Sequence, residues 1–222
     1  MPRKRVAVLI SGRGSNMVAL IEAAKYPGYP ADIVLVVSNE SEAKGLAYAR
    51  AAGIATALVD HHKFGKDREA FEHAVQAELI AHRVELVCLA GFLRLLTPWF
   101  VGQWAGRLLN IHPALLPHFK GLDTHARALA AGTKRHGATV HFVVPEMDSG
   151  PIIMQGAVPV LADDTEAALA ARVLEVEHRI YPLALKLVAQ GRVAIVGGGC
   201  TIDGAVPLGG VLTMSENGEP PK

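Results

Sequence analysis

Hydrophobic positions along the chain fall into short continuous runs that alternate with amphipathic stretches, the pattern of an α/β protein. Apolar residues at helical spacing, such as Phe71, Val75 and Leu79, indicate helices. Strands are predicted at 5–11, 33–37, 56–59, 86–90 and 108–112, and helices at 17–24, 43–52 and 68–81. Strands that alternate with helices favour a parallel, doubly wound sheet with right-handed crossovers and helices on both faces.

The pattern changes after Pro113, where a loop rich in Pro and Gly covers residues 113–121. A helix is predicted at 124–131, two further strands at 138–144 and 152–160, and a long helix from an N-cap at Asp164 to residue 189, kinked at Pro182. Beyond Gly197 we expect a turn and at most one or two edge strands. The prediction is a Rossmann-like, mostly parallel twisted sheet of about seven strands, to which the carboxyl-terminal strands and the long helix add.

Length and composition restrict the class of protein. The 222 residues fit one α/β domain, with halves at 1–112 and 113–196 and a tail at 197–222. A net charge of +1 gives no electrostatic footprint for nucleic acid or an anionic membrane. The apolar run 6–10 is too short for a signal peptide, and Cys88 and Cys200 suggest neither disulfides nor a metal site. We therefore expect a cytoplasmic protein without metal, nucleic-acid partner or membrane partner.

Candidate chemistry lies at the end of the fifth predicted strand, which Pro113 must terminate because proline cannot donate to a sheet ladder. Residues two apart on a strand share a face, so Asn110 and His112 should project side by side where such sheets bind ligands. An amide donor beside a titratable imidazole suits the stabilisation of an oxyanion and the movement of a proton. An isolated Asn-x-His-Pro is also compatible with a purely structural strand end.

A glycine-rich loop, residues 12–16, follows the first predicted strand and opens a helix. Unpaired amides and the helix dipole at such a position favour a phosphate. The dinucleotide fingerprint would need glycine at Met17 and an acidic residue after the second strand, where Ser38 and Asn39 stand instead. The loop therefore favours a monophosphate over NAD, although a plain turn fits it equally well.

Several other polar residues have two possible roles. Asp148 lies in a predicted turn and could simply form it, but if it reaches His112 its carboxylate would raise the pKa of the imidazole. Glu177 could bind an amine if it faces inward from its helix, and Arg68 could hold an anion at a helix start. His141 is expected to be a core histidine, and irregular backbone at 92–96 could bind a planar heterocycle.

Six motifs occur in an order that resembles one family over residues 6–196, the folate-dependent phosphoribosylglycinamide formyltransferases. They are Ser11-Gly12-x-Gly14-Ser15-Asn16, Ala90-Gly91-Phe92-x-Arg94, Leu109-Asn110-Ile111-His112-Pro113-x-Leu115-Leu116-Pro117, His141-Phe142-Val143, Asp148-x-Gly150-Pro151 and Glu177-His178-x-x-Tyr181-Pro182. The resemblance implies transfer of the formyl group of 10-formyltetrahydrofolate to the amine of phosphoribosylglycinamide in purine biosynthesis. A monomer or homodimer is expected, with a mobile loop at about 115–135.

The resemblance also implies residue roles, with phosphate binding in 1–112 and folate binding and catalysis in 113–196. Asn110 and His112 would stabilise the oxyanion, His112 would be the acid catalyst, and Asp148 would raise its pKa. The expected phosphoribosylglycinamide site comprises Gly14, Ser15, Asn16, Leu174, Glu175, Val176 and Glu177. The expected folate site comprises Arg68, Leu93, Arg94, Leu95, Leu96, Asn110, Val144, Pro145, Glu146, Met147 and Asp148.

Three alternatives are less well supported by the sequence. A formyltetrahydrofolate hydrolase, in which water replaces the amine, is expected to carry an amino-terminal regulatory domain, and the first strand here begins at Val6. A methionyl-tRNA formyltransferase would need an additional carboxyl-terminal domain and a basic surface. A non-catalytic nucleotide-binding module would not require Asn110, His112 and Asp148 together.

Overall fold

The computed structural model describes residues 2–204 and 211–213, and the chain falls into two units. The first unit comprises Met1–Asn110 with Val143–Pro145, and the second comprises Ile111–Phe142 with Glu146–Lys222. The division lies inside a strand, two residues before the predicted boundary between the halves 1–112 and 113–196. The expectation of a single domain stays a prediction.

Five parallel strands form the sheet of the first unit, in the order β5-β4-β1-β2-β3. The Val, Ile and Leu runs of the inner strands are buried because helices cover a parallel sheet on both sides, whereas the edge strand at residues 55–58 is partly exposed. All five strands that the sequence predicts here are confirmed. They are β1 (Lys4–Ile10), β2 (Ala31–Ser38), β3 (Ala55–Leu58), β4 (Leu86–Leu89) and β5 (Leu108–His112).

The helices of the first unit include two that the hydrophobic pattern did not predict. The 3₁₀ helix η1 (His61–Phe64) and helix α4 (Pro98–Gln103) are too short to show a hydrophobic period. A signal for α4 was nonetheless present, because Thr97 caps its first turn and Pro98 occupies its first position. The predicted helices are confirmed as α1 (Ser15–Ala24), α2 (Lys44–Ala51) and α3 (Arg68–Ala81).

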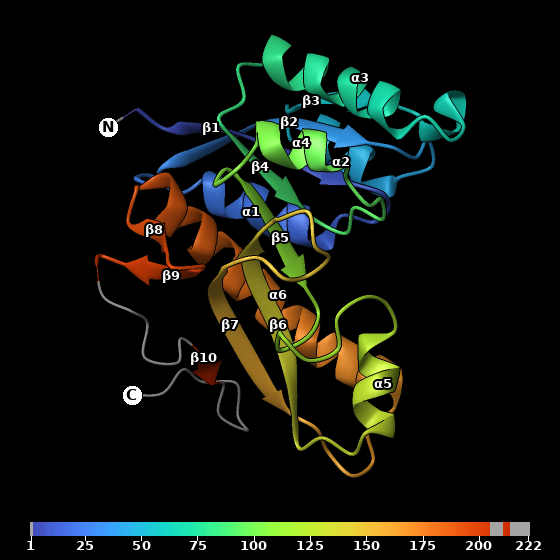
Figure 1. The fold of residues 1–222 in the computed structure, drawn as a ribbon, viewed down its shortest axis with the longest axis vertical. Helices are drawn as coiled ribbons and strands as arrows, with labels where there is room; N and C mark the ends of the chain where they lie inside the picture. The colour runs from blue at the N-terminus through green and yellow to red at the C-terminus, as the bar shows by residue number, and fades with distance from the viewer. Residues whose placement is uncertain (1, 205–210, 214–222) are drawn as a thin grey trace. The chain divides into compact units, whose positions relative to one another are not determined.

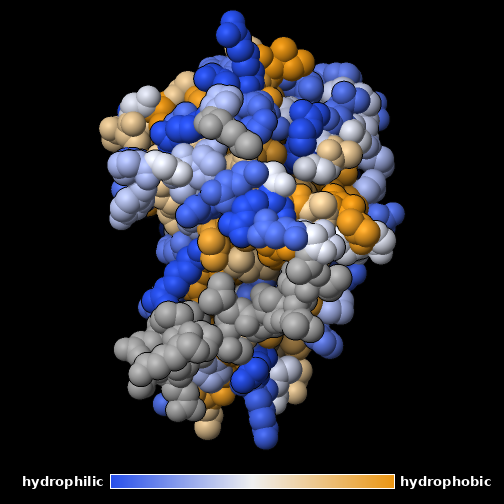
Figure 2. Space-filling view, turned by 90° about the vertical axis from the view of Figure 1, so that its left-hand side faces the viewer, coloured by the Kyte–Doolittle hydropathy of each residue, from blue (hydrophilic) through white to orange (hydrophobic). Residues whose placement is uncertain are grey.

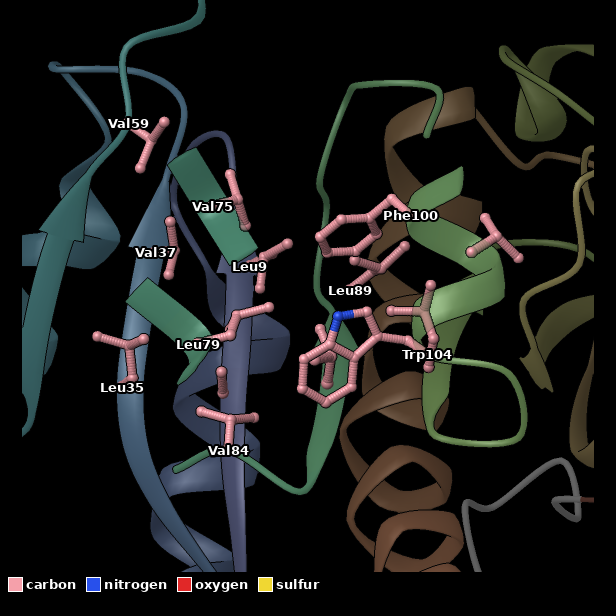
Figure 3. Packing of buried hydrophobic residues seen from close by; sticks show 14 of the residues in the cluster. Leu9, Leu35, Val37, Val59, Val75, Leu79, Val84, Leu89, Phe100 and Trp104 are labelled. Carbon is pink, nitrogen blue, oxygen red and sulfur yellow. The ribbon is translucent and has the colours of Figure 1, made fainter. Parts of the chain in front are cut away.

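Side chains that alternate along the strands of the first unit build a core on each face of its sheet. On one face Leu9 belongs to a buried cluster with Val75 of α3 and Trp104 after α4 (Figure 3). On the other face α2 approaches β1 so closely that a Cβ on Gly45 would lie 2.5 Å from Cδ1 of Ile10. Helices therefore flank both faces, as predicted.

The second unit contains the antiparallel pair β6 (Arg135–Phe142) and β7 (Ile152–Pro159), beside which the long helix α6 (Glu166–Ala189) runs (Figure 1). Gly156 of β7 permits this close packing, because a Cβ there would lie 2.1 Å from Cγ1 of Val176. Strand β10 (Val211–Thr213) adds to β7 in parallel. The remaining elements are α5 (Thr124–Ala130) and the hairpin of β8 (Val193–Val196) and β9 (Gly199–Ile202).

The fold class predicted from the sequence, an α/β protein with a mostly parallel sheet flanked by helices, is confirmed, with one local correction. The N-cap of α6 is Thr165, whose hydroxyl accepts from the Ala168 amide, and not Asp164. Asp164 instead forms a bidentate ion pair with Arg172 of α6. Pro182 lies inside α6 as predicted.

On the face shown in Figure 2, hydrophilic residues predominate and hydrophobic ones occur in small groups between them. Among the residues that the structure describes, no helix has both the length and the apolar character needed to span a membrane.

Candidate active site

Strand β5 delivers the two polar residues that the sequence singled out. Asn110 is half-buried and His112 is 5% exposed, and their spacing places them on the same face of the strand. Pro113 follows directly and ends the strand, as predicted. The imidazole of His112 is therefore presented at the strand end in a largely water-free environment.

Asp148, in the connection between β6 and β7, reaches His112. Its Oδ2 lies 3.4 Å from Nδ1 of His112, and the two side chains are only 10% and 7% exposed. Asp148 adopts a left-handed backbone conformation, with φ of 49°, which aspartate tolerates better than most residues. The predicted contact between carboxylate and imidazole is present, and the low exposure limits the screening of their interaction by water.

The segment that follows β5, residues 113–123, folds back onto this pair. The carbonyl oxygen of Phe119 lies 2.9 Å from Nε2 of His112, and the amide of Gly121 donates to Oδ2 of Asp148 at 2.9 Å. Nζ of Lys120 donates to the hydroxyl of Ser149 at 2.6 Å. Both ring nitrogens of His112 thus face oxygen atoms that can accept hydrogen bonds.

His141 of β6 is a third member of the cluster, which its position in the sequence did not predict. It is 2% exposed, and its Nε2 lies 3.9 Å from Oδ1 of Asp148. Nδ1 donates to the Phe142 carbonyl oxygen at 2.9 Å, so the neutral ring directs its acceptor nitrogen toward Asp148. Burial lowers the pKa of His141. The expectation of a buried histidine is correct, and its contact with Asp148 is the new information.

The glycine-rich loop of the first unit has the backbone that an anion site needs. Gly14 is the N-cap of α1 and has a φ of 71°, a conformation that favours glycine. Ser15 and Asn16 open the helix, and no acidic residue lies in its first turn. The positive end of the helix dipole is therefore not opposed by a local negative charge.

Several residues expected to bind folate lie on α3 and in the loop after β4 of the first unit. Arg68 is exposed as the first residue of α3, and one turn later Phe71 contacts both the ring of Phe92 and the guanidinium of Arg94. Leu93 is 74% exposed. Leu95 is exposed and Leu96 is half-buried.

The remaining expected site residues are on α6 and in the connection after β6. Glu177 is 7% exposed and therefore faces inward, as the amine-binding role requires, whereas Glu175 is exposed. Val176 packs against Gly156, and Leu174 is half-buried. Pro145, Glu146 and Met147 are exposed, and Val144 is half-buried.

Metal-ligand side chains also come together at one place among residues 2–204. Glu40, His61 and His62 each offer one ligand atom, and these atoms lie within 4.8 Å of one another. Nδ1 of His61 is also 3.0 Å from the carbonyl oxygen of Asn39. His112 and Asp148 do not belong to this group.

Comparison with known proteins identifies the family. A model of the formyl transferase family matches residues 4–185. The phosphoribosylglycinamide formyltransferase of Escherichia coli (strain K12) is 46% identical over 90% of this chain and 93% of its own length. A structure of the phosphoribosylglycinamide formyltransferase of Coxiella burnetii is 40% identical, with a TM-score of 0.86 over 91% of this chain and 95% of that one.

A longer relative shows the same similarity over part of its length. The trifunctional purine biosynthetic protein adenosine-3 of Gallus gallus is 52% identical over 86% of this chain, but the chain spans only 19% of that protein. The family model covers most of the chain, and the E. coli relative is matched over nearly its whole length. The chain belongs to the formyl transferase family.

Proposed function

We propose that this protein transfers the formyl group of 10-formyltetrahydrofolate to the amine of 5'-phosphoribosylglycinamide, a step of purine biosynthesis. The observation that carries the proposal is the buried pair of His112 and Asp148 at the end of β5, with an oxygen-to-nitrogen distance of 3.4 Å. The similarity to bacterial phosphoribosylglycinamide formyltransferases over almost their full length supports the choice of substrates.

The reaction needs an electrostatic partner for a developing negative charge. The free amine attacks the formyl carbon, a carbon–nitrogen bond forms, and the formyl oxygen becomes an oxyanion. The side-chain amide of Asn110 and the protonated imidazole of His112 would donate to this oxygen, and Asp148 would stabilise the positive charge on the ring. His112 is then the acid catalyst.

Collapse of the tetrahedral intermediate completes the transfer. The carbon–nitrogen bond to N10 breaks, the carbonyl re-forms, and a proton passes from the attacking nitrogen to N10, through water near Asp148. The products are formylglycinamide ribonucleotide and tetrahydrofolate. The carboxylate of Asp148 is suited to the relay because it is only 10% exposed and is held by the Gly121 amide.

Substrate binding follows from the charges of the two ligands. The 5'-phosphate would bind Gly14, Ser15 and Asn16 at the positive end of α1, and the Glu177 carboxylate would accept a hydrogen bond from the free amine. The remaining nucleotide contacts would come from Leu174, Glu175 and Val176. The folate would bind Arg68, Leu93, Arg94, Leu95, Leu96, Asn110, Val144, Pro145, Glu146, Met147 and Asp148.

The decisive experiment is an absorbance assay of tetrahydrofolate formation from 10-formyltetrahydrofolate. We expect turnover only when phosphoribosylglycinamide is present, and a loss of about 100-fold or more in His112→Ala. His82, a half-buried residue at the end of α3, serves as the control when replaced by alanine and should retain activity. Turnover with water alone would instead indicate a hydrolase, and a folded protein inactive with both acceptors would contradict the proposal.

A further inference from the structure

A buried amide at the end of β2 has no role in the proposed reaction. Asn39 stands where a dinucleotide-binding sheet carries an acidic residue, and it is only 1% exposed. Its Oδ1 accepts a hydrogen bond of 2.6 Å from the hydroxyl of Ser11, at the end of β1. A polar group that is buried so deeply is retained only when its hydrogen bonds are satisfied, and Ser11 is one of its partners.

Ser11 also contacts the segment expected to bind the folate. Its hydroxyl oxygen accepts a hydrogen bond of 2.8 Å from the backbone amide of Leu93, and its own amide donates to the carbonyl oxygen of Gly91 at 3.0 Å. The single hydroxyl of Ser11 therefore joins the carboxyl ends of β1 and β2 to the loop after β4. Ser11 is also the residue directly before the glycine-rich loop that opens α1.

The direction of each hydrogen bond follows from the donors available. The Leu93 amide can only donate, so the Ser11 oxygen accepts from it and the Ser11 hydrogen remains for Oδ1 of Asn39. The amide nitrogen of Asn39 then donates to a carboxylate oxygen of Glu40 at 3.4 Å. Nδ1 of His61 donates to the backbone carbonyl of Asn39 and so cannot accept from this amide. The Glu40 contact fixes the orientation of the Asn39 amide and, through it, the orientation of the Ser11 hydroxyl.

We propose that Ser11 is a positioning residue that, held by Asn39, fixes the backbone of Leu93 in the conformation that binds the folate. The inference rests on the proposed function only for the identity of the ligand, because the hydrogen bonds themselves lie within the first unit. Leu93 is 74% exposed, so apolar burial of its own side chain holds it only weakly. The Ser11 hydroxyl supplies the specific restraint that the exposed side chain does not.

The chain offers a matched control for the hydroxyl of Ser11. Ser38, one residue before Asn39, is fully buried, and its hydroxyl bonds only to the backbone amide and carbonyl of Glu40. Replacing either serine by alanine removes the same atom from the same end of the sheet. Only Ser11→Ala removes the partner of the Leu93 amide.

The first test does not depend on the proposed activity. Hydrogen–deuterium exchange is followed by mass spectrometry in peptides that cover residues 91–96. We expect faster exchange of the Leu93 amide in Ser11→Ala than in the wild type, and unchanged exchange there in Ser38→Ala. Equal exchange rates in Ser11→Ala and the wild type would overturn the proposal.

The second test separates positioning from general stability. We expect Ser11→Ala to raise the KM for 10-formyltetrahydrofolate by about fivefold, the effect of one hydrogen bond, with kcat within about twofold of the wild type. Because Asn39 acts through Ser11, adding Asn39→Ala to Ser11→Ala should raise this KM little further. Equal rises in KM for Ser11→Ala and Ser38→Ala would reduce the effect to stability and overturn the proposal.

The two tests also distinguish the two proposals. A wild-type protein that transfers no formyl group would contradict the proposed function, while the exchange experiment would still decide whether Ser11 restrains Leu93. An active wild type whose folate KM is unaffected by Ser11→Ala would contradict the positioning role alone.

Discussion

Replacing Asp148 by asparagine removes one negative charge beside His112 while keeping the shape of the side chain. Two unit charges 3.4 Å apart, the distance between Oδ2 and Nδ1, interact by about 5 kcal/mol at an effective dielectric constant of about 20. The carboxylate charge is shared between two oxygens, so we take about 2–4 kcal/mol as the loss. If the transition state needs a positively charged ring, kcat should fall by roughly 30- to 1,000-fold.

The same substitution should leave the fold intact. The amide oxygen of Asn at position 148 can still accept from the Gly121 amide and face Nδ1 of His112. Its NH₂ group would then face Nε2 of His141, which is an acceptor because Nδ1 of that ring donates to the Phe142 carbonyl. We therefore expect the free energy of unfolding to change by less than about 1 kcal/mol.

Two measurements on the same preparation test this reasoning. The kcat for formyl transfer is measured with both substrates saturating, and the free energy of unfolding is measured by urea titration. Asp163→Asn makes the same chemical change at an exposed position and should preserve both values. Wild-type turnover in a folded Asp148→Asn protein would refute the electrostatic role. A destabilisation above about 3 kcal/mol would refute the prediction that the new amide keeps its hydrogen bonds at position 148.

Three further predictions concern packing, pH and nucleotide binding. Gly150→Ala should destabilise the protein by about 1–3 kcal/mol in urea unfolding, because a Cβ there would lie 1.8 Å from the Phe142 carbonyl oxygen; Gly102→Ala, with no atom within 4 Å, should not. Burial lowers the pKa of His136 to about 4 in the folded protein, below the unfolded value of about 6.5. The free energy of unfolding should therefore be highest above pH 6.5 and fall by up to about 3 kcal/mol as the pH falls from about 6.5 to about 4. His136→Gln should flatten the pH dependence of unfolding over this range, and an unchanged slope would argue against it. Ser15→Ala should weaken phosphoribosylglycinamide binding about fivefold in calorimetry without changing folate affinity, whereas equal losses for both ligands would contradict a phosphate role.

The strands and long helices could be predicted from the sequence because burial dictates their composition. Strands covered on both faces read as unbroken apolar runs, and α3 has a clear helical period. Strand β6 begins three residues before its predicted start, because Arg135 and His136 do not look like core residues. His136 is nevertheless only 1% exposed, and burial of this polar residue depends on tertiary packing that the local pattern does not reveal.

The candidate site could be predicted only in part. The spacing of Asn110 and His112 places them on one face of a strand without any knowledge of the fold. The approach of Asp148 depends on a turn with positive φ and on a connection between β6 and β7, and local spacing specifies neither. The contact with Phe119 involves a backbone carbonyl, which every residue possesses, so no side-chain pattern reports it.

The carbonyl of Phe119 occupies the nitrogen of His112 through which the proposed acid catalyst would meet its ligand. Nε2 of His112 carries a single hydrogen, which Phe119 receives at 2.9 Å, so a formyl oxygen can take that place only after the carbonyl has withdrawn. A ligand that uses Nε2 binds only the molecules whose Phe119 carbonyl has withdrawn. Its observed dissociation constant therefore equals the intrinsic constant divided by the fraction of such molecules. Changes in the segment from 113 to 123 that never touch a ligand would thereby alter how tightly it is held.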